Sequence, residues 1–145
     1  MYIPESVEVT SVAAPPPAVR EGEGYATPNI LVIGPGGGAR RLRGRLLAEG
    51  FPVDWAASAR QGLRELQEKT VSLAIVELEM PDMDGFTMLQ LLKATMPLPP
   101  PVIILSSTHS KEDVMQSLRL GARDFVMYPI DYPILLRKIH RLTQD

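Results

Sequence analysis

Five short runs of mostly apolar residues recur along the chain, and each is followed by a segment with the spacing of an amphipathic helix. Apolar runs of four or five residues that end at turn residues are typical of buried strands. Strands buried on both faces occur in parallel sheets covered by helices on each side. Right-handed crossovers between such strands predict a doubly wound α/β fold. The predicted strands are Ile30–Ile33, Pro52–Ala56, Leu73–Val76, Val102–Leu105 and Asp124–Met127.

The segments after these strands carry the start and stop signals of helices. The first helix is predicted over Ala39–Glu49 and is ended by Gly50. The other four begin at side chains that cap helix N-termini, namely Ser58, Asp84, Ser110 and Asp131. The apolar residues expected on the buried helix faces are, in chain order, Leu42, Leu46, Leu63, Leu66, Phe86, Leu89, Leu92, Met96, Val114, Leu118, Leu135, Ile139 and Leu142. Five helices therefore alternate with five strands.

The first 28 residues differ in composition from the rest of the chain. They contain Pro4, three consecutive prolines at positions 15–17 and Pro28, without a sustained helical or strand period. Such a segment buries too little apolar area to offset its ordering entropy. We therefore expect a flexible, proline-rich tail over residues 1–28 and a domain over residues 29–145. Within the tail, Val7–Val12 alternates in the way of a strand that adds to a sheet edge.

Composition narrows the class of protein. The formal net charge is −2, so no overall basic charge attracts nucleic acid or anionic membranes. The chain has no cysteine, which excludes disulfides and thiolate metal sites. It has no visible secretory signal and no apolar run of the roughly 20 residues that span a bilayer. We expect a cytoplasmic domain that binds neither nucleic acid nor membrane.

Three segments, taken together, resemble the receiver domains of bacterial response regulators. Glu77–Gly85 reads Glu-Leu-Glu-Met-Pro-Asp-Met-Asp-Gly and resembles the segment around the phosphoacceptor of that family. Pro101–Ser107 and Gly121–Pro129 resemble the family's fourth strand and its Gly-Ala-x-Asp-aromatic-x-x-Lys-Pro segment. The resemblance covers essentially Asn29–Asp145. It implies a flavodoxin-like fold with the strand order 2-1-3-4-5, in which sites lie at the carboxyl ends of the strands.

The residues that carry out the family's chemistry are mostly replaced. Gly34 and Pro35 stand where the resemblance implies an acidic pair that holds Mg²⁺. Glu77 stands at the phosphoacceptor aspartate and Tyr128 at the lysine, whereas Ser106 keeps the hydroxyl position. Magnesium prefers carboxylate oxygens, and phosphoryl transfer needs cations to neutralise developing charge. The sequence thus predicts a pseudo-receiver that is not an enzyme and has no metal or cofactor.

Two interpretations of Glu77 remain open at this point. Its carboxylate is either a built-in imitation of a phosphorylated aspartate or a relic that is hydrogen-bonded to Ser106 or Tyr128. Phe125 corresponds to the aromatic residue that moves when receivers are activated. Without phosphorylation, we expect Phe125 to keep a single conformation.

The segment Gly34–Gly38 offers a different kind of site. Followed by Ala39, it matches a loose G-x-G-x-x-A pattern that opens a helix, as in dinucleotide-binding proteins. Ala57 and Ser58 occupy the region where such proteins place an acidic residue. Arg40 and Arg41 are candidate anion contacts within the basic stretch Arg40–Arg45, whose alternative is a solvated helix face.

The resemblance implies signalling through a protein partner. We expect a stand-alone receiver, monomeric or weakly dimeric, that binds its partner without phosphorylation through the Lys111–Arg141 face. A small-ligand or nucleotide sensor built on the Gly34–Gly38 loop is one alternative. A residual phosphoacceptor switch is the other.

Overall fold

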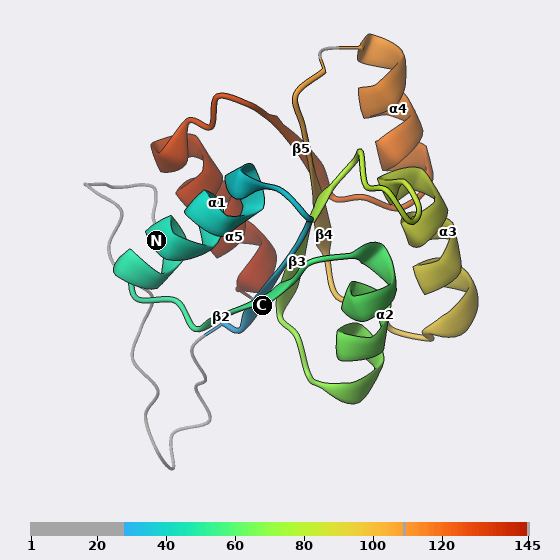
Figure 1. The fold of residues 1–145 in the computed structure, drawn as a ribbon, viewed down its shortest axis with the longest axis horizontal. Helices are drawn as coiled ribbons and strands as arrows, with labels where there is room; N and C mark the ends of the chain where they lie inside the picture. Colours follow the sequence, from blue (N-terminus) through green and yellow to red (C-terminus); the bar gives the residue numbers. More distant parts are fainter. Residues whose placement is uncertain (1–27, 109, 145) are drawn as a thin grey trace.

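The computed structural model describes residues 28–108 and 110–144 and contains a single parallel sheet between two helical layers (Figure 1). The strand order is β2-β1-β3-β4-β5. The predicted flavodoxin-like fold and its strand order are thus confirmed. Residues 1–27, which make up the expected tail except for Pro28 and include Val7–Val12, lie outside the described residues. The elements are β1 (Ile30–Ile33), α1 (Gly37–Ala48), β2 (Val53–Ala56), α2 (Ala59–Glu68), β3 (Leu73–Glu77), α3 (Gly85–Thr95), β4 (Val102–Ser106), α4 (Lys111–Arg119), β5 (Asp124–Met127) and α5 (Tyr132–Thr143).

Local signals account for most helix ends. The side chains of Ser58, Asp84, Ser110 and Asp131 each accept a hydrogen bond from the backbone N–H three residues later. Each cap thereby satisfies a donor that the first helical turn leaves unpaired. Gly50 and Gly121 follow α1 and α4 with φ angles of 97° and 110°, which glycine adopts without steric penalty.

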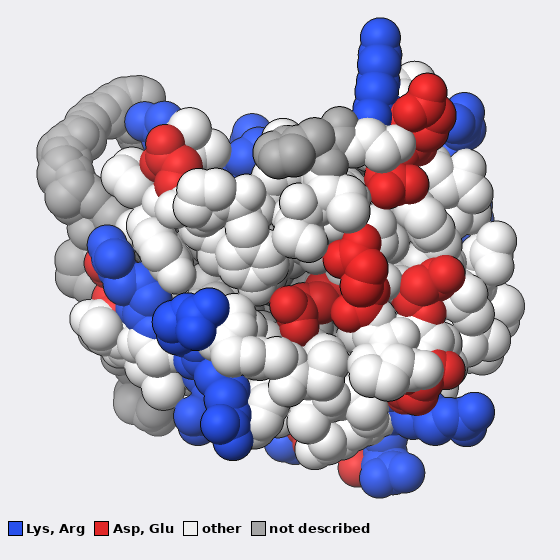
Figure 2. Space-filling view, turned by 45° about the horizontal axis from the view of Figure 1, so that its top comes forward, with Lys and Arg blue, Asp and Glu red and all other residues white. Residues whose placement is uncertain are grey.

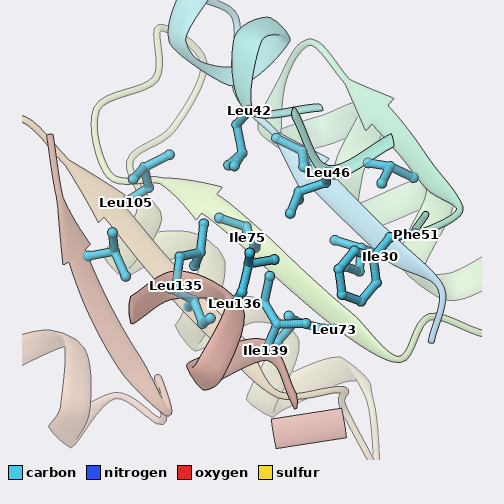
Figure 3. Close-up of a cluster of buried hydrophobic side chains, with 14 of the residues drawn as sticks. Ile30, Leu42, Leu46, Phe51, Leu73, Ile75, Leu105, Leu135, Leu136 and Ile139 are labelled. Atoms are coloured by element: carbon cyan, nitrogen blue, oxygen red, sulfur yellow. The ribbon is translucent and has the colours of Figure 1, made fainter. Parts of the chain in front are cut away.

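The sheet separates two apolar clusters. Under α1 and α5, Leu42 and Leu46 meet Leu135, Leu136 and Ile139 (Figure 3). The other cluster lies beneath α2 and α3, on the opposite face. All four residues of β1 and the first four of β3 are buried. These central strands are covered on both sides, as their unbroken apolar sequence predicts. Among the described residues, no helix has the length and apolar character needed to cross a membrane.

The fourth helix corrects the sequence prediction. Leu118, expected in the core, is 45% exposed, and Val114 is only partly buried. Within α4 only Ser117 is buried, and its hydroxyl donates to the Asp113 carbonyl. The helix lies against the edge strand β5 and not over the middle of the sheet. Apolar spacing alone does not show how wide a stripe a helix buries.

Other differences are smaller. The first helix begins at Gly37 rather than Ala39, because Gly36 takes the extended backbone of an N-cap with φ −95° and ψ 176°. The second strand begins at Val53, and the carbonyl of Pro52 accepts from the Ile30 amide. Some helix residues expected in the core are only partly buried against it: Leu63, Phe86, Met96 and Leu142.

Candidate functional site

The carboxyl ends of four parallel strands meet at one edge of the sheet. Gly34 follows β1, Glu77 ends β3, Ser106 ends β4 and Tyr128 follows β5. The register places Ile33 beside Val76, Glu77 beside Leu105 and Ser106 beside Met127. Figure 2 brings this edge forward and shows acidic side chains in its middle and toward the right, with a group of basic side chains on the left and further basic side chains at the top and lower right. The structure therefore brings together the positions that the sequence indicated.

The Glu77 side chain lies where a side chain at position 34 would be. A Cβ atom added to Gly34 would lie 2.6 Å from the Glu77 Cγ and Cδ atoms and closer still to its Oε1. Real Cβ atoms do not approach other heavy atoms so closely. The extra methylene of Glu77 thus brings its carboxylate into the volume that any side chain at position 34 would need. The two replacements at this site fit one another.

Tyr128 and Gly38 form a second matched pair. A Cβ atom on Gly38 would lie 2.8 Å from the Tyr128 Cζ and closer to its hydroxyl oxygen. The Tyr128 hydroxyl donates to Glu77 Oε2 at 3.2 Å. Burial, followed by the negative charge of Glu77 and this hydrogen bond, raises the pKa of Tyr128, and the nearby Arg41 guanidinium opposes the rise. The phenol therefore stays neutral where the family's lysine would bring a positive charge.

Ser106 is bonded to a different carboxylate. Its side chain is 1% exposed, and its Oγ donates to Glu79 at 3.1 Å from Oε2 and 3.3 Å from Oε1. Of the two partners that the sequence left open for Glu77, the structure shows Tyr128 and not Ser106. The sequence did not indicate the contact between Glu79 and Ser106, because no local pattern links residues 27 positions apart.

The two candidate anion contacts on α1, Arg40 and Arg41, have different surroundings. The Arg40 guanidinium stacks on the Trp55 ring, 5.1 Å from its centroid. Arg41 instead lines an open hollow of about 460 Å³ together with Gly38, Glu77, Tyr128 and Pro129. The carbonyl of Gly34 accepts a 2.8 Å hydrogen bond from the Trp55 indole N–H. Two aromatic residues thus contact the Gly34–Gly38 loop: Trp55 at Gly34 and Tyr128 at Gly38.

Two aspartates near the site accept hydrogen bonds from backbone amides at helix N-termini. Asp84 caps α3, as predicted, and accepts from the Thr87 amide. Asp82 reaches across to α2 and accepts from the amides of Ala59 and Arg60 at 3.2 and 2.9 Å. Desolvation alone would raise the pKa of Asp82, but these backbone hydrogen bonds together hold it below its ordinary value. Within residues 28–108 and 110–144, no group of three acidic, histidine or cysteine side chains is placed to hold a metal ion.

Comparison with known proteins agrees with this geometry. The model of the response regulator receiver domain family matches residues 36–140, so the chain belongs to that family. It is 41% identical over 113 residues to protein-glutamate methylesterase/protein-glutamine glutaminase 6 of Anaeromyxobacter dehalogenans, covering 76% of this chain and 31% of that protein. It is 37% identical over 105 residues to protein-glutamate methylesterase/protein-glutamine glutaminase 1 of Myxococcus xanthus, covering 70% of this chain and 30% of that protein. The chain thus spans less than a third of the length of these two relatives.

Solved structures share the fold. A response regulator receiver protein from Pseudomonas putida superposes with a TM-score of 0.75 at 23% identity, over 81% of this chain and 98% of that one. A response regulator receiver domain protein from Methanospirillum hungatei JF-1 gives a TM-score of 0.72 at 27% identity, over 80% of this chain and 93% of that one. These similarities identify the protein as a receiver domain of a response regulator.

Proposed function

We propose that this receiver domain works by binding a protein partner without being phosphorylated, and that the domain itself is not an enzyme. The observation that carries the proposal is that Glu77 and Tyr128 take the space that side chains at positions 34 and 38 would need. Glu77 occupies the space above Gly34, and Tyr128 occupies the space above Gly38 and donates to Glu77. The Glu77 carboxylate is thereby engaged by a neutral phenol of the same chain.

The groups that phosphoryl transfer needs are also replaced. Magnesium binding usually relies on carboxylates, and the residues after β1 are Gly34 and Pro35. The Gly34 carbonyl is already engaged by the Trp55 indole. Neutral Tyr128 cannot supply the positive charge that stabilises the transferred group. Each replacement removes a different contribution, so restoring one alone does not restore the chemistry.

The partner surface that we propose is formed by α4, β5 and α5, the Lys111–Arg141 face. Its exposed large apolar side chains are Met115, Leu118, Met127 and Ile134, which are 47%, 45%, 40% and 41% exposed. A hollow of about 360 Å³ between β5 and α5 is lined by Phe125, Val126, Met127, Tyr128, Pro129, Asp131, Ile134, Leu135 and Lys138. Of the four exposed side chains, Met127 and Ile134 line this hollow, whereas Met115 and Leu118 lie on α4. Exposed apolar side chains on one face favour a protein-binding surface.

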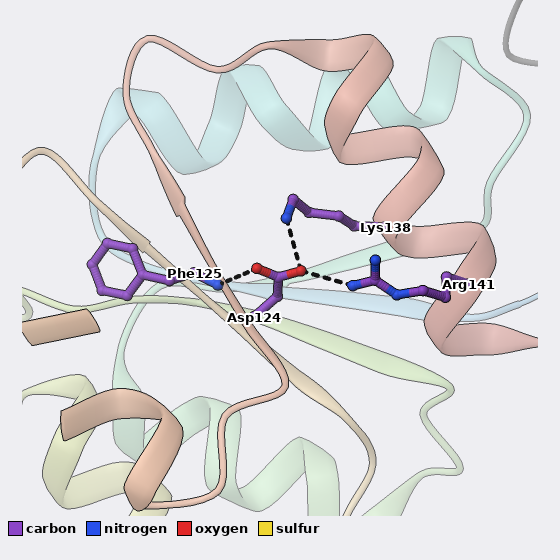
Figure 4. A network of polar contacts seen from close by, with 4 residues as sticks. All are labelled: Asp124, Phe125, Lys138 and Arg141. Atoms are coloured by element: carbon purple, nitrogen blue, oxygen red, sulfur yellow. Dashed lines mark hydrogen bonds and ion pairs between the residues drawn. The ribbon is translucent and has the colours of Figure 1, made fainter. Parts of the chain in front are cut away.

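An ion-pair network anchors β5 to α5 within this face (Figure 4). Asp124 Oδ2 accepts from Lys138 Nζ and from an Arg141 guanidinium nitrogen, both at 2.8 Å. Asp124 Oδ1 accepts from the Phe125 amide at 2.8 Å. One carboxylate therefore connects the edge strand to the last helix, which supports a preformed surface.

The first experiment tests the absence of phosphorylation. The protein is incubated with acetyl phosphate and Mg²⁺ and its intact mass is measured. We expect no addition of a phosphoryl group, either in the wild-type protein or in Tyr128→Lys, because carboxylates are still missing after β1. Stoichiometric labelling of the wild-type protein at Glu77 would contradict the proposal and favour the residual phosphoacceptor switch.

The second experiment tests the surface. Affinity capture from the native cell is compared for the wild-type protein, Met115→Glu, Leu118→Glu and the control Leu47→Glu. Leu47 is 44% exposed but lies on α1, outside the proposed face. We expect the two α4 variants to lose a partner that the wild-type protein and Leu47→Glu retain. Equal capture by all four proteins would contradict the surface assignment.

The remaining expectations are part of the same proposal. We propose a cytoplasmic monomer or weak homodimer with no methylesterase activity of its own, since the match covers only 31% of the methylesterase of A. dehalogenans. The Gly34–Gly38 loop is not proposed as a nucleotide site, because Tyr128 covers Gly38 and Arg40 stacks on Trp55. A rise in melting temperature with ATP or NAD would contradict this.

A further inference from the structure

A hydrogen-bonded chain runs from the loop after β3 to the first turn of α4. Its centre is Ser106, which is buried, and its first member is Glu79, whose side chain reaches Ser106 from an exposed position in the loop. The Thr108 amide donates to Ser106 Oγ at 3.1 Å. The Thr108 hydroxyl donates to Asp113 Oδ2 at 3.3 Å. Asp113 lies in the first turn of α4, where its amide donates to the Ser110 cap.

The hydroxyl protons of this chain can be shared in more than one way. Ser106 and Thr108 each have one hydroxyl proton, and a charged carboxylate can only accept. The two hydroxyl oxygens also lie 3.0 Å apart, and either can donate to the other. When the Ser106 proton goes to Glu79 and the Thr108 proton goes to Asp113, each carboxylate has a hydroxyl donor. The Thr108 amide donates to one of the two acceptor positions of the Ser106 hydroxyl oxygen. Hydrogen bonds to charged groups are stronger than neutral ones, which favours donation to the carboxylates over donation between the two hydroxyls.

The position of α4 depends heavily on such polar contacts. No large apolar side chain of α4 is fully buried; Ser117 is its one buried residue, while Met115 and Leu118 face solvent. Elements with few buried apolar contacts are those that open locally at low free energy. A hydrogen-bonded anchor at the N-terminus of this helix therefore has more influence than it would on α5, whose buried residues are Leu135, Leu136 and Ile139.

We propose that Glu79 is the positioning residue that holds the β4–α4 junction and α4 in one arrangement, ready for the partner. The inference rests on the proposed function, because it concerns the same α4–β5–α5 face. It differs from the interpretation of Glu77 as an imitation of phosphoaspartate. Glu77 is bonded to Tyr128 on the β5 side, whereas Glu79 supplies the negative charge at the Ser106 hydroxyl. The residue that acts on α4 is thus two positions beyond the phosphoacceptor position.

Amide hydrogen exchange, followed by NMR on the full chain without a partner, tests the proposal. The variants are Glu79→Ala, Ser106→Ala, the double variant and Glu79→Gln, with Glu77→Gln as the matched control. We expect Glu79→Ala to speed exchange about tenfold at Thr108 and along α4, and to leave the amides of β1 and β3 unchanged. Adding Glu79→Ala to Ser106→Ala should have no further effect, because the two residues act through one bond. Glu79→Gln keeps an acceptor and should lie between Glu79→Ala and the wild-type protein, whereas Glu77→Gln should leave α4 unchanged.

Three results would overturn the proposal: unchanged exchange in α4, a full Glu79→Ala effect in the Ser106→Ala background, or equal loss of protection in α4 and in the central strands. The last would mean that Glu79 supports global stability rather than this helix. Failure of the proposed function is a separate outcome, since it would appear as unchanged partner capture by Met115→Glu and Leu118→Glu.

Discussion

At position 34 the absence of a side chain is what lets Glu77 adopt its observed place. We predict that Gly34→Ala destabilises the domain by about 1–3 kcal/mol, because the new methyl group displaces Glu77 from Tyr128. Gly44→Ala is the control: it lies within α1 with open space around its Cβ position, and should stabilise the helix by about 0.5–1 kcal/mol. Urea unfolding measures both.

The cause of the Gly34→Ala effect is tested in the same way. In a Glu77→Ala background the space is empty, and adding Gly34→Ala should then cost far less than it does alone. An undiminished loss would show that the backbone of Gly34, and not the contact with Glu77, is responsible.

Neutralising Glu77 should have little effect on folding. In Glu77→Gln the side-chain carbonyl still accepts from the Tyr128 hydroxyl, so we predict a change of less than about 1 kcal/mol in the free energy of unfolding. Chemical denaturation at pH 7 measures it, and a large loss would reveal a further role of the charge. Partner capture by the same variant separates the two interpretations of Glu77: lost binding would support imitation of a phosphorylated aspartate, and retained binding would contradict it.

At the scale of elements, Asp124 is the clearest electrostatic link, since it joins β5 to α5. Burial alone would raise its pKa, but hydrogen bonds from Lys138, the Phe125 amide and Arg141 hold the pKa below its ordinary value. A depressed pKa in the folded state means that the contribution is present above the unfolded pKa of about 4 and is lost as pH falls through the folded value. We predict that Asp124→Asn costs about 1–2 kcal/mol at pH 7.

The pH dependence checks the mechanism. Urea unfolding of the wild-type protein and Asp124→Asn should give free energies that converge as pH falls from 5 toward 2. Asp54→Asn is the control, because Asp54 is half exposed and its contact with Lys69 is 3.6 Å long. Its effect should stay below about 0.5 kcal/mol at every pH. A constant difference between the wild-type protein and Asp124→Asn would assign the loss to packing instead of charge.

Local sequence signals explain why so many elements could be predicted. Caps such as Ser110 act within three residues, and unbroken apolar runs such as Ile30–Ile33 identify central strands without knowledge of their neighbours. The exposure of Leu118 could not be predicted, because it depends on where α4 lies relative to the edge of the sheet. Similarly, motif order located Glu77 and Ser106 at the site, but it could not show that Ser106 is bonded to Glu79.

At the scale of the whole molecule, the matched pairs at the site bear on conformational switching. A two-state equilibrium shifts only when something binds its states differently. Here β5 is bounded by the Tyr128–Glu77 hydrogen bond at one end and by the Asp124 network at the other. Phe125, between them, packs partly buried against the α2–α3 cluster. This arrangement favours a single conformation of β5.

We therefore predict that β5 of the full chain shows no millisecond exchange in NMR relaxation-dispersion measurements. Tyr128→Phe removes the hydroxyl that donates to Glu77 and should introduce exchange at Phe125 and its neighbours, because one end of the strand is released. Tyr132→Phe is the matched control, since it also removes a tyrosine hydroxyl but keeps the ring whose centroid lies 4.4 Å from the Arg45 guanidinium. It should introduce no millisecond exchange in β5. Exchange already present in the wild-type protein and unchanged in Tyr128→Phe would show that β5 switches independently of the Tyr128–Glu77 hydrogen bond, under a trigger other than phosphorylation.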